Sequence, residues 1–344
     1  MNIDQYQNHF REKALQQGFS AENIDKCINY AIPLLNNKFP IIFNTSHFCS
    51  LVGYNKIFIN RVAVYTSYFY RSFKIKKRNG QMRTIEEPLP SLKEIQHWIL
   101  NNILEKFDVS PFAKAYKKKH NLKENVRFHS NQETVLNLDI KNFFPSIKSK
   151  SIEGIFKNMG YSPLVSNLLA KLCTRNKILP QGAPTSPFLS NIFMKEIDDA
   201  ISKYCILGKI KYTRYADDMT FSGTFDKDNL SNFVEELLKI HDLELNHEKT
   251  HYLKKNQRQI VTGIVVNQKL QVPFEKRNAI RSDLYYIKKF GIEEHKTFRK
   301  IKKSNYISHL LGKINFILNI NPNDQEFKEY KQFLINLKQN HPLL

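Results

Sequence analysis

Three acidic residues, far apart in the chain, are the groups of this sequence whose spacing could do chemistry. Asp217 and Asp218 stand side by side at a turn between two strand-like runs that together cover 210–221. Aspartates at a turn are ordinarily only solvated, because Asp is a favoured turn residue. Asp139 changes this interpretation, since it ends a separate apolar run at 135–138 and strand pairing would bring its carboxylate beside the turn.

Clustered carboxylates of this kind suit a pair of divalent cations. Two metal ions about 3.5–4 Å apart need ligands from more than one strand, and the acids tolerate one another only when cations neutralise them. Mg²⁺ prefers oxygen ligands together with substrate phosphates. We therefore expect two Mg²⁺ ions and in-line attack of a primer 3′-hydroxyl on the α-phosphate of a deoxynucleoside triphosphate (dNTP). One ion would activate the attacking oxygen, and the other would stabilise the leaving pyrophosphate.

A basic segment precedes these acids and could hold the triphosphate. The run at 65–85 is aromatic and basic, and an Asn-Gly pair at 79–80 predicts the turn of a β-hairpin. Phosphoryl transfer needs basic groups on the phosphates, and Lys74, Lys76 and Arg83 are the candidates. For Lys74 and Lys76, charge patterning alone supports a generic basic surface equally well.

The charge of the whole chain favours a polyanionic partner. The 344 residues include 53 Lys and Arg against 32 Asp and Glu, a formal net charge of +21. Nucleic acid is the commonest partner of such a surface, although an anionic membrane would also attract it. The sequence contains neither an apolar run of roughly 18 residues nor a signal peptide, so we expect a cytoplasmic protein without membrane contact.

Two further patterns do not predict metal sites. The cysteines are widely spaced and form no Cys-x-x-Cys pair, which favours buried reduced thiols: Cys27, Cys49, Cys173 and Cys205. Residues 247–251 match the His-Glu-x-x-His pattern of zinc proteases. That motif needs a long helix, whereas the alternation from 243 to 253 is typical of strand and turn.

Short strands alternate with helices along the chain, which predicts an α+β fold with an antiparallel sheet. Positions 1–60 predict a helical layer broken at Pro33 and Pro40. Ser91 is the expected N-cap of the next helix. We expect helices at 92–107, 149–159, 163–174, 189–204 and 228–240, strands near 250–254 and 259–266, and largely helical sequence from about 275. No linker or repeat divides the chain.

With these elements in view, three blocks resemble the reverse-transcriptase family, and most closely its bacterial retron members, over about 70–318. Residues 137–144, Asn-Leu-Asp-Ile-Lys-Asn-Phe-Phe, resemble the first catalytic block of the family. Residues 179–187, Leu-Pro-Gln-Gly-Ala-Pro-Thr-Ser-Pro, resemble the block that shapes the nucleotide and template pocket. Tyr-Ala-Asp-Asp at 215–218 resembles the catalytic turn. The order and co-occurrence of the three blocks is a specific signal.

The resemblance assigns roles to individual residues. It implies metal contacts at Asp139, Ile140, Asp217 and Asp218. It implies that Phe144 is the gate that rejects a ribose 2′-hydroxyl. It implies nucleotide contacts at Gln181, Gly182, the fingers arginine Arg83 and the palm lysine Lys249.

Two elements point to retrons in particular. The segment at 125–129 is similar to the retron Asn-Ala-x-x-His element through Asn125 and His129, with Val126 in place of the usual Ala. Val-Thr-Gly at 261–263 fits the second retron element without change. The resemblance implies that these residues, Asn125, His129, Val261, Thr262 and Gly263, recognise a cognate structured non-coding RNA of the msr-msd type.

That RNA would prime synthesis from an internal guanosine 2′-hydroxyl and yield a branched, RNA-linked single-stranded DNA (msDNA). Retron complexes often act in antiphage defence with a separate effector protein, so the resemblance implies such a partner and a possible higher-order complex. The basic run Lys117-Lys118-Lys119 would ordinarily be a solvated loop, and as a neighbour of the 125–129 element it could clamp RNA phosphates.

The resemblance also implies a right-hand fold of fingers, palm and thumb. A helical region at 1–60 would precede fingers at 61–135, a palm at 136–268 with fingers sequence inserted at about 149–185, and a helical thumb at 269–344. Basic residues from 276 to 313, among them Arg281 and Lys288, suit a thumb that follows the backbone of a template duplex. For most of the aromatic residues among them we expect core packing.

Other functions remain open at this point. Another bacterial defence reverse transcriptase would use a different template or primer. A group II intron reverse transcriptase is less favoured, because no maturation or endonuclease domain is evident. A non-enzymatic RNA-binding scaffold with a polymerase fold predicts broken metal ligands, yet all three aspartates are present.

Overall fold

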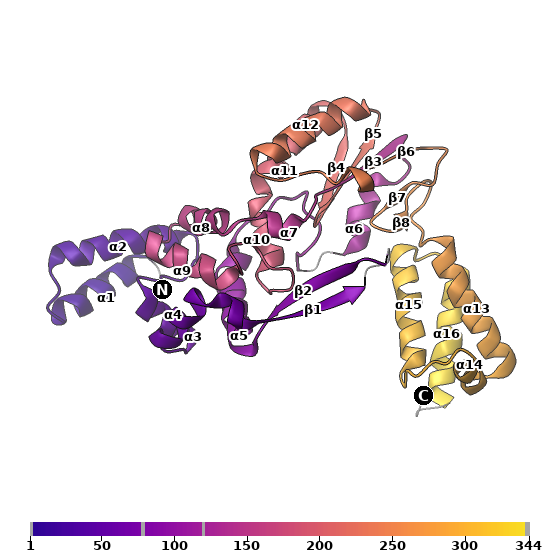
Figure 1. Cartoon of the computed structure of the whole chain (residues 1–344), viewed down its shortest axis with the longest axis horizontal. Helices are drawn as coiled ribbons and strands as arrows, with labels where there is room; N and C mark the ends of the chain where they lie inside the picture. Colours follow the sequence, from indigo (N-terminus) through magenta and orange to yellow (C-terminus); the bar gives the residue numbers. More distant parts are fainter. Residues whose placement is uncertain (1–2, 77–79, 119–120, 341–344) are drawn as a thin grey trace.

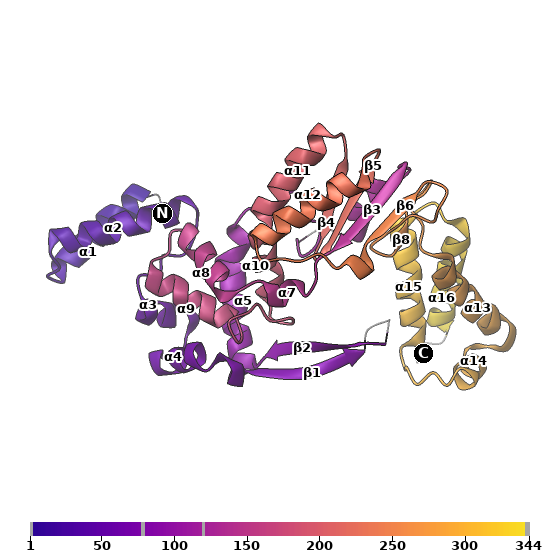
Figure 2. The ribbon, with the colours of Figure 1, turned by 45° about the horizontal axis from the view of Figure 1, so that its top comes forward.

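The computed structural model describes residues 3–76, 80–118 and 121–340. The chain runs from an N-terminal helical layer through a central sheet to a separate helical bundle at the opposite end (Figure 1). A long two-stranded hairpin lies below the sheet and reaches towards the bundle (Figure 2). No helix within the described residues is both long and apolar enough to span a bilayer.

The N-terminal layer consists of four helices, α1 (Ile3–Gln16), α2 (Ala21–Asn36), α3 (Thr45–Val52) and α4 (Lys56–Val64). The prediction that a helix breaks at Pro33 is wrong, because α2 continues to Asn36. The proline ring removes one backbone donor from the helix. The chain nevertheless stays helical after Pro33, and the carbonyl of this residue accepts from both the backbone and the side-chain nitrogen of Asn37, at 3.3 and 2.9 Å. The helix therefore ends one turn later than expected.

The basic hairpin predicted at 65–85 is confirmed, with strands β1 (Tyr70–Lys76) and β2 (Met82–Pro88). Its expected turn includes Asn79, which lies outside the described residues. Helix α5 (Pro90–Asn102) follows. The prediction of Ser91 as N-cap is wrong, because Leu89 occupies that position and Pro90 begins the helix, where its fixed φ fits and no donor is lost.

The central sheet is antiparallel with the order β4-β5-β3-β6. Its strands are β3 (Thr134–Asp139), β4 (Lys211–Tyr215), β5 (Asp218–Gly223) and β6 (His251–Lys254). In the register of β3 and β5, Asp139 lies opposite Asp218. The predicted α+β class and the predicted hairpin at the acidic turn are thus confirmed.

The helices of the central part cover the sheet and fill the space towards the N-terminal layer (Figure 2). They are α6 (Leu122–Val126), α7 (Phe143–Ser146), α8 (Ser149–Asn158), α9 (Pro163–Cys173), α10 (Ser186–Phe193), α11 (Lys195–Leu207) and α12 (Lys227–Ile240). The single helix expected at 189–204 is two helices that meet at Met194. The strand expected at 259–266 is a small hairpin of β7 (Ile260–Val261) and β8 (Ile264–Val265).

The hairpin of β7 and β8 turns at Thr262 and Gly263, which have φ values of 43° and 82°. Positive φ at both central residues is the geometry of a type I′ turn, which Gly adopts without a steric penalty. A two-residue connection of this kind fixes Val261 and Ile264 as partners. The Val-Thr-Gly element is therefore the turn of a hairpin.

The terminal bundle contains α13 (Phe274–Phe290), α14 (Ile292–Phe298), α15 (Tyr306–Ile320) and α16 (Gln325–Asn340). The prediction that most of its aromatic residues pack in a core is wrong. Tyr306 is buried, but the other four are exposed: Tyr285, Tyr286, Phe290 and Phe298. The core is mainly aliphatic, with residues such as Leu284, Leu310 and Ile314 at helical spacing, and it also contains the fully buried ring of Phe327.

Two hydrophobic clusters stabilise the chain. One joins the N-terminal layer, α5, the central helices and the inner face of the sheet. The other joins the terminal bundle to the β7–β8 hairpin and also contains Val126 and Val135. Three cysteines are buried as expected, whereas Cys27 is only partly buried.

Candidate active site

The three aspartates of the sequence analysis meet at one edge of the sheet. Asp139 ends β3, Asp217 lies in the turn between β4 and β5, and Asp218 begins β5. Each carboxylate offers an oxygen within 4.8 Å of the other two. Strand pairing between Asp139 and Asp218 produces this proximity, and the backbone N–H of Ile140 also donates to the carbonyl of Asp217 at 3.1 Å. Ile140 is therefore part of the frame of the cluster.

Mutual repulsion marks the cluster as a cation site. Burial and the charges of Asp217 and Asp139 raise the pKa of Asp218 to about 7. Burial and the charge of Asp139 raise the pKa of Asp217 as well. Both pKa shifts mean that the charged form of each carboxylate is energetically unfavourable here. A divalent cation bound among the carboxylates would offset this energetic cost. An all-oxygen donor set drawn from two segments fits a hard divalent metal.

Lys249 already supplies one positive charge to the cluster. Its Nζ lies 2.8 and 2.9 Å from the two carboxylate oxygens of Asp139. Burial lowers the pKa of Lys249, but the hydrogen bond to Asp139 and its charge outweigh this and raise it. Asn246 donates from its backbone and its side chain to the same residue, at 2.7 and 3.2 Å. The expected contact of Lys249 with a nucleotide stays a prediction.

The loop at 180–185 is held against the hairpin of β1 and β2. The backbone N–H of Glu86 on β2 donates to the carbonyl of Gln181 at 2.9 Å. Gly182 has a φ of 137°, and a Cβ there would lie 2.7 Å from the carbonyl oxygen of Glu86. Only glycine permits this approach. Gln181 and Gly182 thus join the hairpin that carries Lys74, Lys76 and Arg83 to the central part of the chain.

An aromatic pair lies beside the acidic turn. The ring of Phe144, the predicted gate, is 6.3 Å from the ring of Tyr116. Burial and the charge of Asp217 raise the pKa of Tyr116 to about 12, and Arg83 opposes the rise. Tyr116 therefore lies near both Asp217 and Arg83. The sequence analysis missed Tyr116, whose φ of 62° is unusual for a non-glycine residue and is not visible in a sequence.

The retron-type elements are buried, which corrects the expectation that all of their residues contact RNA. Asn125, His129 and Val261 are fully buried. The imidazole of His129 pairs with the hydroxyls of Ser222 and Thr213 at 2.7 and 2.8 Å. In this structure these three side chains cannot reach RNA, because sheet and hairpin cover them.

The two elements contact each other instead. The side-chain amide of Asn125 donates to the hydroxyl of Thr262 at 3.3 Å, and Val126 and Val261 share one hydrophobic cluster. Of the predicted RNA-binding residues in these elements, only Thr262 and Gly263 retain partial exposure. The elements therefore form one structural unit between the sheet and the terminal bundle.

The two predicted contacts in the bundle differ from each other. Arg281 makes a bidentate ion pair with Glu326 at 2.5 and 2.6 Å, so its guanidinium is already engaged within the protein. Lys288 is exposed, and its ammonium lies about 5 Å from the rings of Tyr330 and Phe333. Between these two residues, the structure leaves Lys288 the more accessible to a phosphate.

The zinc-protease pattern at 247–251 is not a metal site. His247 lies in a short 3-10 helix at His247–Lys249, and His251 begins β6. The two imidazoles therefore do not share one helical face, as that motif requires. Lys249 within the same segment contacts Asp139 instead. The rejection of the zinc interpretation is confirmed.

Comparison with known proteins links this geometry to one family. Residues 75–266 match the family described as reverse transcriptase (RNA-dependent DNA polymerase). The Retron Ec86 reverse transcriptase of Escherichia coli is 32% identical over 298 residues, which cover 85% of this chain and 87% of that protein. The Retron Ec83 reverse transcriptase of Escherichia coli is 33% identical over 275 residues, 74% of this chain and 83% of that protein.

A relative from another organism shows a similar level of identity. The Retron Mx162 reverse transcriptase of Myxococcus xanthus is 33% identical over 232 residues, which cover 59% of this chain and 48% of that protein. The range matched by the family contains all three carboxylates, Lys249 and Arg83.

Asp218→Asn is predicted to stabilise the metal-free protein. Because the pKa of Asp218 is raised from 3.8 to about 7, the fold loses stability as the pH rises between these two values, and the full cost is present at pH 8. We expect the variant to melt about 2 °C higher than wild type at pH 8 in EDTA, and added Mg²⁺ to raise the melting temperature of wild type more than that of the variant. Asp228→Asn, at an exposed position on α12, is the control. Equal Mg²⁺ effects on wild type and Asp218→Asn would contradict the cation-site assignment.

His129→Gln is predicted to reduce acid sensitivity. Burial lowers the pKa of His129 to about 3 in the folded chain, against about 6.5 when unfolded. Between these values the unfolded state binds more protons, so wild type loses stability as the pH falls below about 6.5. The loss reaches about 2 kcal/mol at pH 5, and a glutamine has no such titration. Urea unfolding of both proteins from pH 7.5 to 5 measures the difference, and parallel pH profiles would refute it.

Proposed function

This chain belongs to the reverse transcriptase family, and we propose that it is a retron-type RNA-directed DNA polymerase. It copies part of a cognate structured RNA into branched, RNA-linked single-stranded DNA. The observation that carries the proposal is the meeting of Asp139, Asp217 and Asp218 within 4.8 Å at one sheet edge. An RNA-binding scaffold would not need this costly cluster of like charges.

The residues around the cluster have different roles in nucleotide addition. Asp139, Asp217, Asp218 and the backbone of Ile140 would hold two Mg²⁺ ions, which would activate the primer 3′-hydroxyl and stabilise the leaving pyrophosphate. Arg83 on the fingers hairpin binds the triphosphate of the incoming dNTP, helped by Lys74 and Lys76.

Contacts with the sugar and the triphosphate complete the pocket. The ring of Phe144 packs against the sugar and excludes a 2′-hydroxyl. The ammonium of Lys249 contacts Asp139 in this structure. When cations occupy the acidic cluster, this ammonium would shift towards the triphosphate of the substrate. Gln181 and Gly182 keep the hairpin in register with the pocket through their contact with Glu86.

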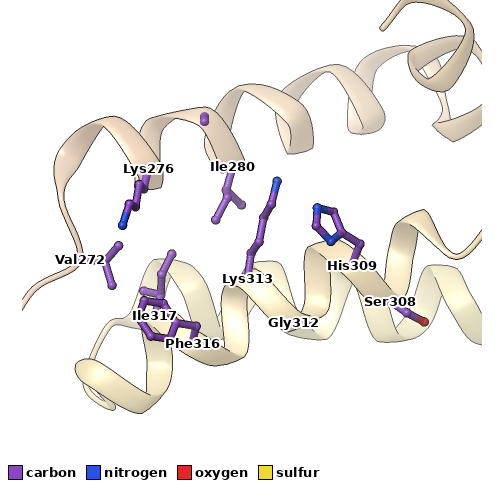
Figure 3. A pocket seen from close by; sticks show the side chains of 10 residues that line it. Val272, Lys276, Ile280, Ser308, His309, Gly312, Lys313, Phe316 and Ile317 are labelled. Carbon is purple, nitrogen blue, oxygen red and sulfur yellow. The ribbon is translucent and has the colours of Figure 1, made fainter. Parts of the chain in front are cut away.

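A groove in the terminal bundle supports binding of a template duplex. It lies between α13 and α15, measures about 660 Å³ and is lined mainly by apolar residues, with the basic side chains of Lys276 and Lys313 directed into it (Figure 3). A second hollow of about 550 Å³ adjoins it and adds further basic residues: Arg299, Lys300, Lys302 and Lys303. Such side chains neutralise phosphates without reading sequence, and the exposed rings of Phe290 and Phe298 are available for base stacking.

The similarity to retron reverse transcriptases supports a specific biological setting. The cognate RNA is of the msr-msd type, its internal guanosine 2′-hydroxyl is the primer, and msDNA is the product. The ribonucleoprotein acts in the cytoplasm in antiphage defence together with a separate effector protein. Sequencing the nucleic acid that copurifies with the chain tests this setting, because template, product and branch point are read together. An unbranched DNA copied from another template would indicate a different bacterial defence reverse transcriptase.

Loss of any metal-binding carboxylate is predicted to abolish DNA synthesis. Asp139→Asn, Asp217→Asn and Asp218→Asn should each reduce extension at least about 1000-fold, because a neutral amide cannot hold the cations. Binding of the copurifying RNA should change little. Extension of that RNA with labelled dNTPs and Mg²⁺ is the measurement, and Asp228→Asn is the matched control. Equal DNA synthesis by wild type and Asp217→Asn would contradict the proposal and favour the non-enzymatic RNA-binding scaffold.

Phe144→Ala is predicted to admit ribonucleotides. Removing the ring opens space at the 2′ position, so discrimination between dNTP and rNTP should fall about 10- to 100-fold with a smaller change in dNTP addition. The ratio of kcat/KM values for the two substrates is the measurement. Phe143→Leu, a change in the buried neighbouring ring, is the control. Unchanged discrimination in Phe144→Ala would remove Phe144 from the gate role.

A further inference from the structure

A buried ion pair lies directly behind the acidic turn. Arg214 on β4 and Asp198 on α11 both have fully buried side chains. The guanidinium meets the carboxylate with two parallel hydrogen bonds, Nε to Oδ1 at 2.8 Å and Nη2 to Oδ2 at 2.7 Å. Tyr212 donates its hydroxyl to the same carboxylate at 2.7 Å. The pair is thus fixed in a single geometry.

The remaining nitrogen of the guanidinium faces the turn itself. Nη1 of Arg214 donates to the carbonyl of Ala216 at 3.0 Å and to Oδ1 of Asn191 at 3.2 Å. Asn191 on α10 in turn donates to the carbonyl of Ala115 at 2.9 Å. We call Asn191, Asp198, Tyr212 and Arg214 the buried network. It connects two helices and a strand to the acidic turn and to the residue before Tyr116.

The contact with Ala216 fixes the peptide that leads into Asp217. Ala216 has a φ of 61°, a left-handed conformation that costs energy for a residue with a side chain. Its carbonyl shares a peptide plane with the N–H of Asp217, so a hydrogen bond to that carbonyl fixes the peptide that precedes the carboxylate-bearing residue. On the other side, Ile140 holds the carbonyl of Asp217. Hydrogen bonds from Arg214 and Ile140 therefore fix the orientation of both peptide planes that flank Asp217.

Stability alone does not account for charges at this position. Apolar side chains of similar volume often replace a buried ion pair at little or no cost in stability. Apolar side chains cannot donate to the carbonyl of Ala216, however. The distinctive contribution of Arg214 is the hydrogen bond that the turn receives.

We propose that Arg214, held by Asp198 and Asn191, is a positioning residue that orients Asp217 for metal binding. The inference rests on the proposed function, since it assigns a role towards the cations of the same site. Partners behind a metal ligand typically change metal affinity or activity by about 10- to 100-fold when removed. The network acts through the turn and touches neither substrate nor metal.

The first test replaces the charges but keeps the volume. The triple variant Asp198→Leu/Tyr212→Phe/Arg214→Met should stay folded, with a melting temperature within about 5 °C of wild type. Mn²⁺ binding followed by electron paramagnetic resonance, without nucleic acid or dNTP, should weaken about 10- to 100-fold. In extension assays the Mg²⁺ concentration for half-maximal rate should rise by a similar factor, while KM for dNTP at saturating Mg²⁺ stays near the wild-type value.

Matched variants separate positioning from general damage. Arg277→Met/Asp324→Leu removes another largely buried ion pair, with a distance of 2.7 Å, far from the turn. It should leave Mn²⁺ affinity and the Mg²⁺ midpoint unchanged. Arg214→Lys keeps the positive charge but loses the planar guanidinium, so its Mn²⁺ affinity should lie between those of wild type and the triple variant. It is the decisive protein if the triple variant does not fold.

The outcomes are distinguishable from failure of the proposed function. Wild-type Mn²⁺ affinity in a folded triple variant, or in Arg214→Lys if only that protein folds, overturns the positioning role. An equal loss of Mn²⁺ affinity in the Arg277→Met/Asp324→Leu control overturns it too. A wild-type chain that binds Mn²⁺ but makes no DNA overturns the polymerase proposal, and the binding comparison still decides the role of Arg214.

Discussion

Repulsion among three carboxylates is the constraint on which this structure depends. Asp139, Asp217 and Asp218 meet within 4.8 Å because β3 pairs with β5, and this pairing must resist the tendency of the charges to separate. The fold opposes repulsion with hydrogen bonds to the carbonyls of Ala216 and Asp217, from Arg214 and Ile140, and with the ammonium of Lys249. A rigid sheet edge keeps the three carboxylates in place, so the cluster has its shape before any cation binds.

Much of this site could be predicted from the sequence, because its main determinants are local. An apolar run that ends in Asp139 and an acidic pair between strand-like runs predict two strands and a turn, and their pairing follows from the antiparallel pattern. The contact of Lys249 with Asp139 and the approach of Gly182 to Glu86 could not be predicted, since each joins segments that only tertiary packing brings together.

Burial was the second limit on prediction from sequence. Asn125 and His129 belong to a short motif for which the resemblance to retron enzymes implied contact with RNA. The structure places His129 between two hydroxyls of the sheet, which pair with both of its ring nitrogens and make its burial tolerable, and Asn125 against the hydroxyl of Thr262. A residue pattern that resembles the retron elements can thus reflect how the sheet joins the terminal bundle.

The shared hydrophobic cluster restricts how the terminal bundle can move. Val126 and Val135, from the central part of the chain, lie in the same cluster as Leu284 and Leu310 of the bundle. A bundle that swung outward as a rigid body would expose this common interior to water. The shared cluster therefore opposes a rigid-body swing of the terminal bundle about the β7–β8 hairpin.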